Sequence, residues 1–121
     1  MRVAVIDIGS NTIKLLVAAR SAGGGIETVH FAVEEARIGR GLGGTLPTLA
    51  PDSIEHGRAA VARLLAVAQT FAPAQTMIVA TSAVRDAANG RDFADRILRE
   101  TGFSVRILTG QQEADTIGRG L

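Results

Sequence analysis

Short apolar runs separated by polar breaks occupy the first third of the chain, in the pattern of β-strands. Residues 2–9, RVAVIDIG, form a nearly unbroken β-rich run, which is typical of a strand covered on both faces. IKLLVAAR at 13–20 follows after a few residues, and apolar and polar residues then alternate within 26–39. The short connections predict an antiparallel meander of three strands, with the first strand central in the sheet.

The spacing becomes helical from Pro51 to Phe71, and Pro51 suits the first position of a helix. The apolar stripe of this helix comprises Ile54, Val61, Leu64, Leu65 and Ala68. A buried strand is predicted at 76–83, TMIVATSA, and a second amphipathic helix at 91–102, RDFADRILRETG. A last strand, SVRIL, follows at 104–108, and a further helix is predicted to begin near Thr109, which has capping-box spacing to Gln112.

The expected order of elements is therefore β-β-β-α-β-α-β-α, which defines an α/β fold. Strands that alternate with helices in the second half run parallel, linked by right-handed crossovers. A chain of 121 residues without an internal repeat or linker corresponds to one domain. We expect a five-stranded mixed sheet flanked by helices.

Composition and charge argue against several functional classes. The net charge is +1 and the basic residues are spread along the chain, so there is no footprint for nucleic acid or a membrane surface. The absence of cysteine excludes disulfides and thiolate zinc sites. Asp7, Asn11 and Lys14 interrupt the first apolar stretch, which is therefore neither a signal peptide nor a membrane span. We expect a cytoplasmic protein.

Small polar residues follow the first strand directly. Asp7 stands at its end, and Gly9, Ser10, Asn11 and Thr12 come next. Backbone N–H groups exposed at such a tight turn can cradle a phosphate, while the carboxylate holds Mg²⁺ through water. The same residue types are also common in ordinary hairpin turns, so both interpretations stand at this point.

A glycine cluster, IGRGLGG, has the spacing of a dinucleotide-binding motif but does not open a helix, because TLPTLAP intervenes. A phosphate-facing loop that carries Arg37 and Arg40 is more plausible, with a solvated loop as the alternative.

The cluster ATSAVRDAANG lies at the carboxyl end of a predicted buried strand, where open α/β sheets place their ligands. Thr81, Ser82 and Arg85 are candidate phosphate donors there. Alternatively, Ser82 caps a helix and Arg85 forms a surface ion pair. For Asn89 capping preference favours a purely structural role, as the N-cap of the next helix.

The last cluster, LTGQQEAD, places Glu113 and Asp115 near the start of a helix. A carboxylate there can serve as a general base, but the helix dipole alone also favours acidic residues, and spacing by itself favours this second interpretation. His30 and His56 are expected to be solvated, because neither belongs to a recognisable catalytic constellation.

The four clusters occur in the order of the motifs of a known family. DIGSNTIKLLV, ARIGRGL, ATSAVRDAAN and LTGQQEA resemble the N-terminal motifs of the exopolyphosphatase and guanosine pentaphosphate phosphohydrolase (Ppx/GppA) family, from Val3 to about Gly118. The resemblance implies the ribonuclease H-like sheet shared by actin, sugar kinases and heat-shock chaperones. It also implies two lobes with the active site between them. The DIGGGS-type loop of the second lobe is absent, so residues 1–121 correspond to the N-terminal lobe, expected to be inactive alone.

The resemblance also implies roles for individual residues. The stretch from Asp7 to Thr12 matches the first phosphate loop, which contacts the terminal phosphate or its Mg²⁺. Arg37 and Arg85 match arginines that stabilise charge on the transferred group. Glu113 matches the acid that activates water. The resemblance therefore favours a general base at Glu113, whereas spacing alone favours an acidic residue that only stabilises the helix start.

Three positions depart from the usual family pattern: Lys14 replaces Arg, Thr109 replaces Ser and Gln112 replaces Glu. Lys14 keeps the charge and Thr109 keeps the hydroxyl, whereas Gln112 leaves Glu113 as the only acid of its pair.

The implied reaction is attack by water on the terminal phosphoanhydride of inorganic polyphosphate, with Mg²⁺ as cofactor. Guanosine pentaphosphate is an alternative substrate. An ATP-binding actin-like or kinase-like domain and a non-catalytic phosphate-binding module are alternative functions. Family members are commonly dimers, which makes a homodimer an expectation here as well.

Overall fold

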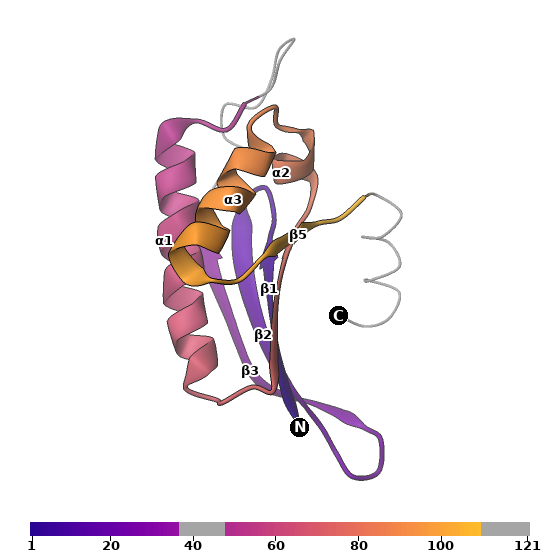
Figure 1. The fold of residues 1–121 in the computed structure, drawn as a ribbon. Helices are drawn as coiled ribbons and strands as arrows, with labels where there is room; N and C mark the ends of the chain where they lie inside the picture. Colours follow the sequence, from indigo (N-terminus) through magenta and orange to yellow (C-terminus); the bar gives the residue numbers. More distant parts are fainter. Residues whose placement is uncertain (37–47, 110–121) are drawn as a thin grey trace.

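A computed structural model of the chain describes residues 1–36 and 48–109. The strands and helices in these ranges are shown in Figure 1: β1 (Arg2–Ile8), β2 (Thr12–Arg20), β3 (Ile26–Glu35), α1 (Pro51–Gln69), β4 (Gln75–Ala80), α2 (Ser82–Asp86), α3 (Gly90–Thr101) and β5 (Val105–Ile107). The five strands form a sheet in the order β3-β2-β1-β4-β5, which puts β1 in the centre as predicted.

Strand directions agree with the expected α/β topology. β1 pairs antiparallel with β2, and β2 pairs antiparallel with β3, so the first three strands form the predicted meander. β4 runs parallel to β1, and β5 runs parallel to β4. The sheet is therefore mixed, and the parallel strands β1, β4 and β5 end at the same edge.

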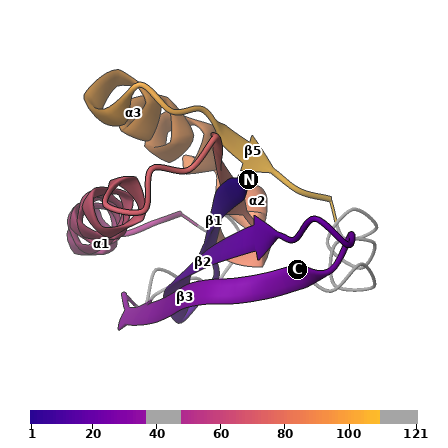
Figure 2. The ribbon, with the colours of Figure 1, turned by 90° about the horizontal axis from the view of Figure 1, so that it is seen from below.

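The helices α1 and α3 cover the same face of the sheet (Figures 1 and 2). The apolar stripe of α1 is buried as expected, apart from Ile54, which is half-buried. It packs in one core cluster with the side chains that the strands direct toward the helices, among them Ile6, Ile8, Ile13, Leu15, Val17 and Ile78. Removal of this apolar surface from water is the main force that holds the helices on the sheet.

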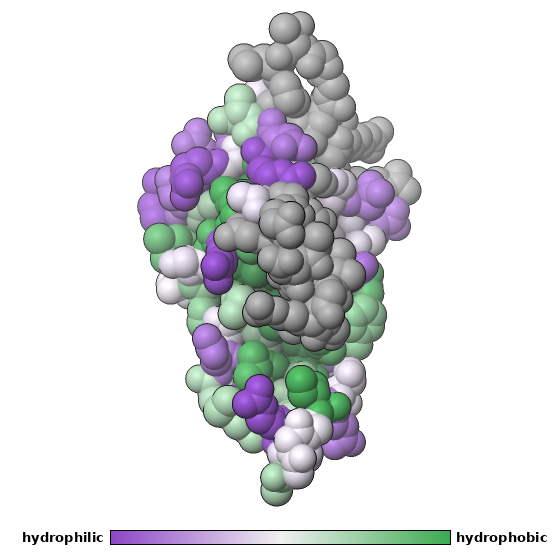
Figure 3. Space-filling model, turned by 90° about the vertical axis from the view of Figure 1, so that its right-hand side faces the viewer, coloured by the Kyte–Doolittle hydropathy of each residue, from purple (hydrophilic) through white to green (hydrophobic). Residues whose placement is uncertain are grey.

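The opposite face of the sheet carries apolar side chains as well, and Figure 3 shows apolar residues among hydrophilic ones on this side of the molecule. Val3 and Val5 of β1 are half-buried there, so β1 is fully buried on one face only within the described residues. Phe31 and Val33 of β3 remain 55% and 48% exposed. Their alternation with polar residues was correctly identified, but their side chains point away from the helices.

His30 occupies the other face of β3, toward the helices. It is half-buried, and its ring stacks on Phe71 with 5.0 Å between the ring centroids. The expectation that His30 is solvated is therefore wrong, because the end of α1 brings an aromatic ring over it. His56 on α1 is exposed, as expected.

Element boundaries differ from the prediction mainly after β4. The strand expected at 76–83 ends at Ala80, and the five-residue helix α2, which was not predicted, follows. α3 ends as predicted at Gly102, whose φ of 80° is the left-handed conformation that closes many helices. The helix expected near Thr109 lies outside the described residues. None of the described helices is long and apolar enough to cross a membrane.

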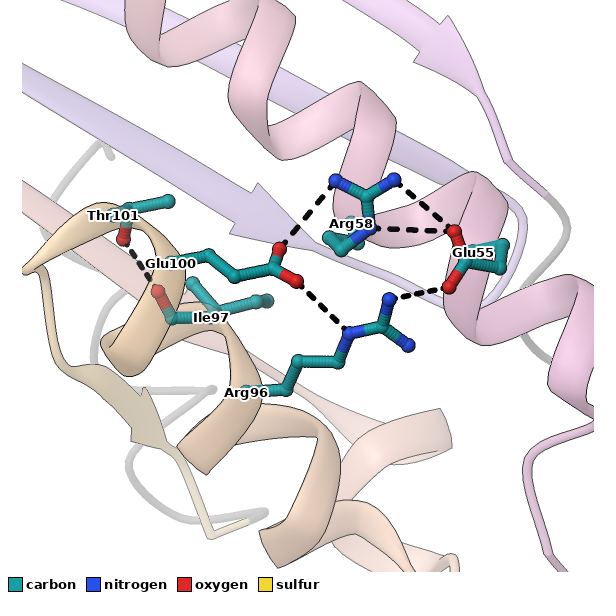
Figure 4. Close-up of polar contacts among 6 residues, drawn as sticks. All are labelled: Glu55, Arg58, Arg96, Ile97, Glu100 and Thr101. Atoms are coloured by element: carbon teal, nitrogen blue, oxygen red, sulfur yellow. Dashed lines mark hydrogen bonds and ion pairs between the residues drawn. The ribbon is translucent and has the colours of Figure 1, made fainter.

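Four exposed charged side chains link α1 to α3 (Figure 4). Arg58 donates to Glu55 at 3.1 Å and to Glu100 at 3.4 Å. Arg96 donates to Glu100 at 3.1 Å and also to Glu55. The hydrogen bonds from Arg96 and then Arg58 hold the pKa of the Glu55 carboxyl below its ordinary value of 4.5. The network joins the two helices at the surface, where each single pair contributes little.

Candidate phosphate site

The carboxyl ends of the three parallel strands lie side by side at one edge of the sheet. The Thr81 N–H donates to the Ile8 carbonyl at 3.1 Å, which ties the end of β4 to the end of β1. The Leu108 N–H donates to the Ala80 carbonyl at 2.9 Å, which ties β5 to β4. In Figure 1 the β1–β2 turn and α2 lie at this same end of the molecule. The segments that follow β1 and β4 therefore start side by side, at the edge where open α/β sheets bind their ligands.

The turn between β1 and β2 is a tight hairpin. The Gly9 N–H donates to the Thr12 carbonyl at 3.0 Å. A Cβ atom at Gly9 would lie 3.2 Å from the same oxygen, so a larger residue fits only if the turn gives way slightly. Ser10 is half-buried and Asn11 is exposed. The hairpin interpretation is thus correct, and it leaves the phosphate interpretation open, because the turn lies at the ligand edge of the sheet.

Asp7 is the acidic residue of this turn region. It pairs with Lys14 on β2 and with Val79 on β4, on the face of the sheet opposite the helices. Asp7 is half-buried overall, and its Oδ1 atom is fully buried.

The donor set at Asp7 can be compared with the needs of Mg²⁺. Within residues 1–36 and 48–109 there is no group of three or more His, Asp or Glu side chains that could hold a metal ion. Among these residues an ion at Asp7 would not have two further carboxylate or imidazole ligands. Mg²⁺ is commonly bound in this way, by one or two carboxylates together with water and phosphate oxygens, so the residues fit Mg²⁺ bound with a phosphate.

Arg85 projects from α2 toward the end of β5. Its Nη1 donates to the Leu108 carbonyl at 3.2 Å, and its Nε lies 3.3 Å from Oδ1 of Asp86. The ion pair predicted as the structural alternative is therefore present. The side chain is 29% exposed.

Asn89 does not act as a helix cap. It occupies the position before α3, but its side chain makes no capping hydrogen bond. Instead, Oδ1 accepts from the Leu49 N–H at 2.7 Å and Nδ2 donates to the Leu49 carbonyl at 3.1 Å. The capping prediction is wrong, because the amide group binds backbone atoms forty residues away. Nothing in the sequence marks Leu49 as the partner.

Several predicted site residues cannot be placed. Arg37 and Glu113 lie outside the described residues, as do Arg40 and Gln112. The backbone of Ser82 begins α2, whereas its side chain is outside the described part of the structure. Of the predicted site residues, the structure describes the positions of Asp7, of Gly9 to Thr12, and of Arg85.

Comparisons with known proteins show the family of this chain. The family model of the Ppx/GppA phosphatase family matches residues 16–121. The Aquifex aeolicus PPX-GPPA enzyme is 32% identical over 93% of this chain and 37% of that chain, with a TM-score of 0.86. An exopolyphosphatase from Cytophaga hutchinsonii is 27% identical over 99% of this chain and 38% of that chain, with a TM-score of 0.91.

T. thermophilus RuvC, in a complex with a Holliday junction substrate, is 17% identical, with a TM-score of 0.53. The match covers 98% of this chain and 72% of that chain, and it shows the fold alone.

The chain spans little more than a third of the length of the Aquifex and Cytophaga proteins. The family match extends over most of the sequence and includes the segments after β4 and β5. The chain belongs to the Ppx/GppA phosphatase family.

Proposed function

We propose that residues 1–121 provide one side of an exopolyphosphatase active site, which hydrolyses the terminal phosphoanhydride bond of inorganic polyphosphate. The observation that carries the proposal is that the chain segments after β1 and β4, which carry the Gly9–Thr12 turn and Arg85, leave the sheet side by side at the edge where the parallel strands end. Membership of the Ppx/GppA phosphatase family and the likeness to a solved exopolyphosphatase support the same reaction class.

The reaction needs placement and charge neutralisation more than covalent help. Water attacks the terminal phosphorus in line, the bond to the bridging oxygen breaks, and orthophosphate and the shortened chain leave. The backbone N–H groups and hydroxyls of the turn orient the terminal phosphate, with Ser82 as a further donor. Arg85 and Arg37 stabilise the charge on the transferred group.

Asp7 is the residue proposed to hold Mg²⁺, which when bound neutralises charge on the phosphate oxygens. Glu113 is the proposed general base, taking the proton from the attacking water. Both assignments come from the family motifs. The position of Asp7 next to the last residue of β1, at the edge where the parallel strands end, is the structural observation that supports the first.

A second lobe is part of the proposal. The chain covers 37% of the Aquifex protein and 38% of the Cytophaga protein, so a site between two lobes would be only half present in residues 1–121. Water would reach the open half, and part of the electrostatic stabilisation would be lost. We therefore expect binding of phosphate chains by this lobe, but little turnover. A homodimer remains a prediction.

The test is Mg²⁺-dependent release of phosphate from long-chain polyphosphate by a protein that carries this lobe and the proposed second one. Glu113→Gln should lower the turnover number by about 10²–10⁴-fold while polyphosphate binding is retained, because only proton transfer is removed. Unchanged hydrolysis by this variant would exclude Glu113 as the base. Parallel assays with guanosine pentaphosphate, which ends in the same type of bond, determine the preferred substrate.

A further inference from the structure

The helix that carries Arg85 is too short to hold its own position. α2 has five residues and its N-cap, Thr81, makes no side-chain capping bond. A single helical turn is unstable in isolation, because its nucleation costs more than its few hydrogen bonds return. The placement of Arg85 therefore depends on the contacts of α2 with the rest of the fold, which include the core packing of Ala83 and Val84 and the bonds of the residues that follow the helix.

After α2 in the sequence, the side chain of Asn89 links the chain to the residues just before α1. Both polar atoms of the Asn89 amide bind the backbone of Leu49, at 2.7 and 3.1 Å. Leu49 is 2% exposed and lies two residues before Pro51, where α1 begins, so it is fixed in the core. The paired bonds define the orientation of Asn89 as well as its distance. They are partly buried, which makes loss of either partner costly.

The next residue brings α2 and α3 into direct backbone contact. A Cβ atom built on Gly90 would lie 1.9 Å from the carbonyl oxygen of Val84, which precedes Arg85. Gly90 is buried, and its N–H donates to the Ala87 carbonyl at 3.1 Å. Because Gly90 packs directly against the backbone of Val84, we expect a displacement of Asn89 to shift α2 and with it the guanidinium group of Arg85.

We propose that Asn89 is a positioning residue, which keeps Arg85 at the phosphate site by fixing the α2–α3 turn to Leu49. The proposal rests on the function proposed above, because it assumes that Arg85 contacts phosphate. An amide is required at this position, since it presents one acceptor to the Leu49 N–H and one donor to the Leu49 carbonyl. A carboxylate would place an acceptor against that carbonyl.

The experiment measures Mg²⁺-dependent binding of inorganic tripolyphosphate to the chain by calorimetry. Asn89→Ala should weaken binding about tenfold, and Asn89→Asp should weaken it similarly. Gly102→Ala is the matched control, because it strains the left-handed residue at the far end of α3 and should leave the affinity unchanged. In an Arg85→Ala background, Asn89→Ala should cause no further loss of affinity, since both changes remove the same contact.

Wild-type affinity in a folded Asn89→Ala variant would overturn the proposal, as would losses that simply add in the double variant. If the wild-type chain itself fails to bind tripolyphosphate, phosphate binding by this lobe is refuted, and hydrogen exchange of a backbone amide then decides the role of Asn89.

The amide to measure is that of Arg85, whose N–H donates to the Thr81 carbonyl at 2.9 Å and therefore reports on the opening of α2. Faster exchange there in Asn89→Ala, but not in Gly102→Ala, supports positioning. Equal exchange contradicts it.

Discussion

Asp7 and Lys14 are directly paired across the β1–β2 hairpin, and both side chains leave the sheet on the face opposite α1 and α3. Opposite residues of an antiparallel pair have Cβ atoms about 5 Å apart. The two side chains therefore leave the sheet next to each other, beside the turn that starts at Gly9. Lys14 is exposed, whereas the Oδ1 atom of Asp7 is buried.

This pairing predicts that Lys14 contributes to binding of a polyanion beside Asp7. Lys14→Met should weaken Mg²⁺-dependent tripolyphosphate binding about fivefold at low salt, with a smaller difference at high salt. Lys14→Arg, which restores the residue usual in the family motif, should bind like the wild type. Titrations at two ionic strengths provide the measurement. Equal affinity of Lys14→Met and the wild type at low salt would exclude a contribution from this charge.

Gly90 predicts a large and local effect on stability. Gly90→Ala should lower the free energy of unfolding by about 3 kcal/mol, because the added Cβ would collide with the backbone of Val84 and force α2 away from α3. Thermal denaturation measures the loss. Gly23→Ala is the control, since a Cβ there meets no atom within 4 Å. Similar melting temperatures for the two variants would show that the α2–α3 contact is not as close as described.

The charge network between α1 and α3 predicts a pH-dependent contribution to stability. The pKa of Glu55 is lowered in the folded protein, so its carboxylate stabilises the fold above the unfolded value of 4.5. This contribution is lost as the pH falls through the lower, folded pKa. The melting temperature of the wild type should therefore exceed that of Glu55→Gln at about pH 6 and approach it at about pH 3.

The difference between the two proteins should also shrink in high salt, because all four side chains of the network are partly exposed. Glu27→Gln, at an exposed position on β3, provides the matched control for loss of one carboxylate. A gap between wild type and Glu55→Gln that stays constant down to pH 3 would contradict the assignment of the effect to ionised Glu55.

Regular elements with strong periodicity were predictable from the sequence. The stripe of α1, from Ile54 to Ala68, repeats over about four turns. Pro51 and Gly102 mark a helix start and a helix end through their own backbone preferences. The first three strands were also predictable, because short connections leave few alternatives to a meander. The meeting of the segments after β1 and β4 followed from the parallel order of those strands.

Features that depend on tertiary contacts could not be predicted. α2 is a single turn without a periodic pattern, and its short length gives it no sequence signal. Ala72, in the turn after α1, adopts a φ of 48°. This conformation is usual for glycine, so an alanine at this position gives no sequence signal for the turn. Asn89 stands at the N-cap position of α3, as its residue type suggests, but its side chain binds the backbone of Leu49. Only the assembled fold brings these two residues together.

The central claim, a phosphate site at the strand ends built around Asp7, is tested most directly by Mg²⁺-dependent tripolyphosphate binding to Asp7→Asn. The account predicts that the wild type binds only with Mg²⁺, and that Asp7→Asn loses at least about tenfold in affinity while remaining folded. Asp95→Asn, which removes the same charge from an exposed position on α3, should bind like the wild type. Undiminished, Mg²⁺-dependent binding by Asp7→Asn would contradict the account.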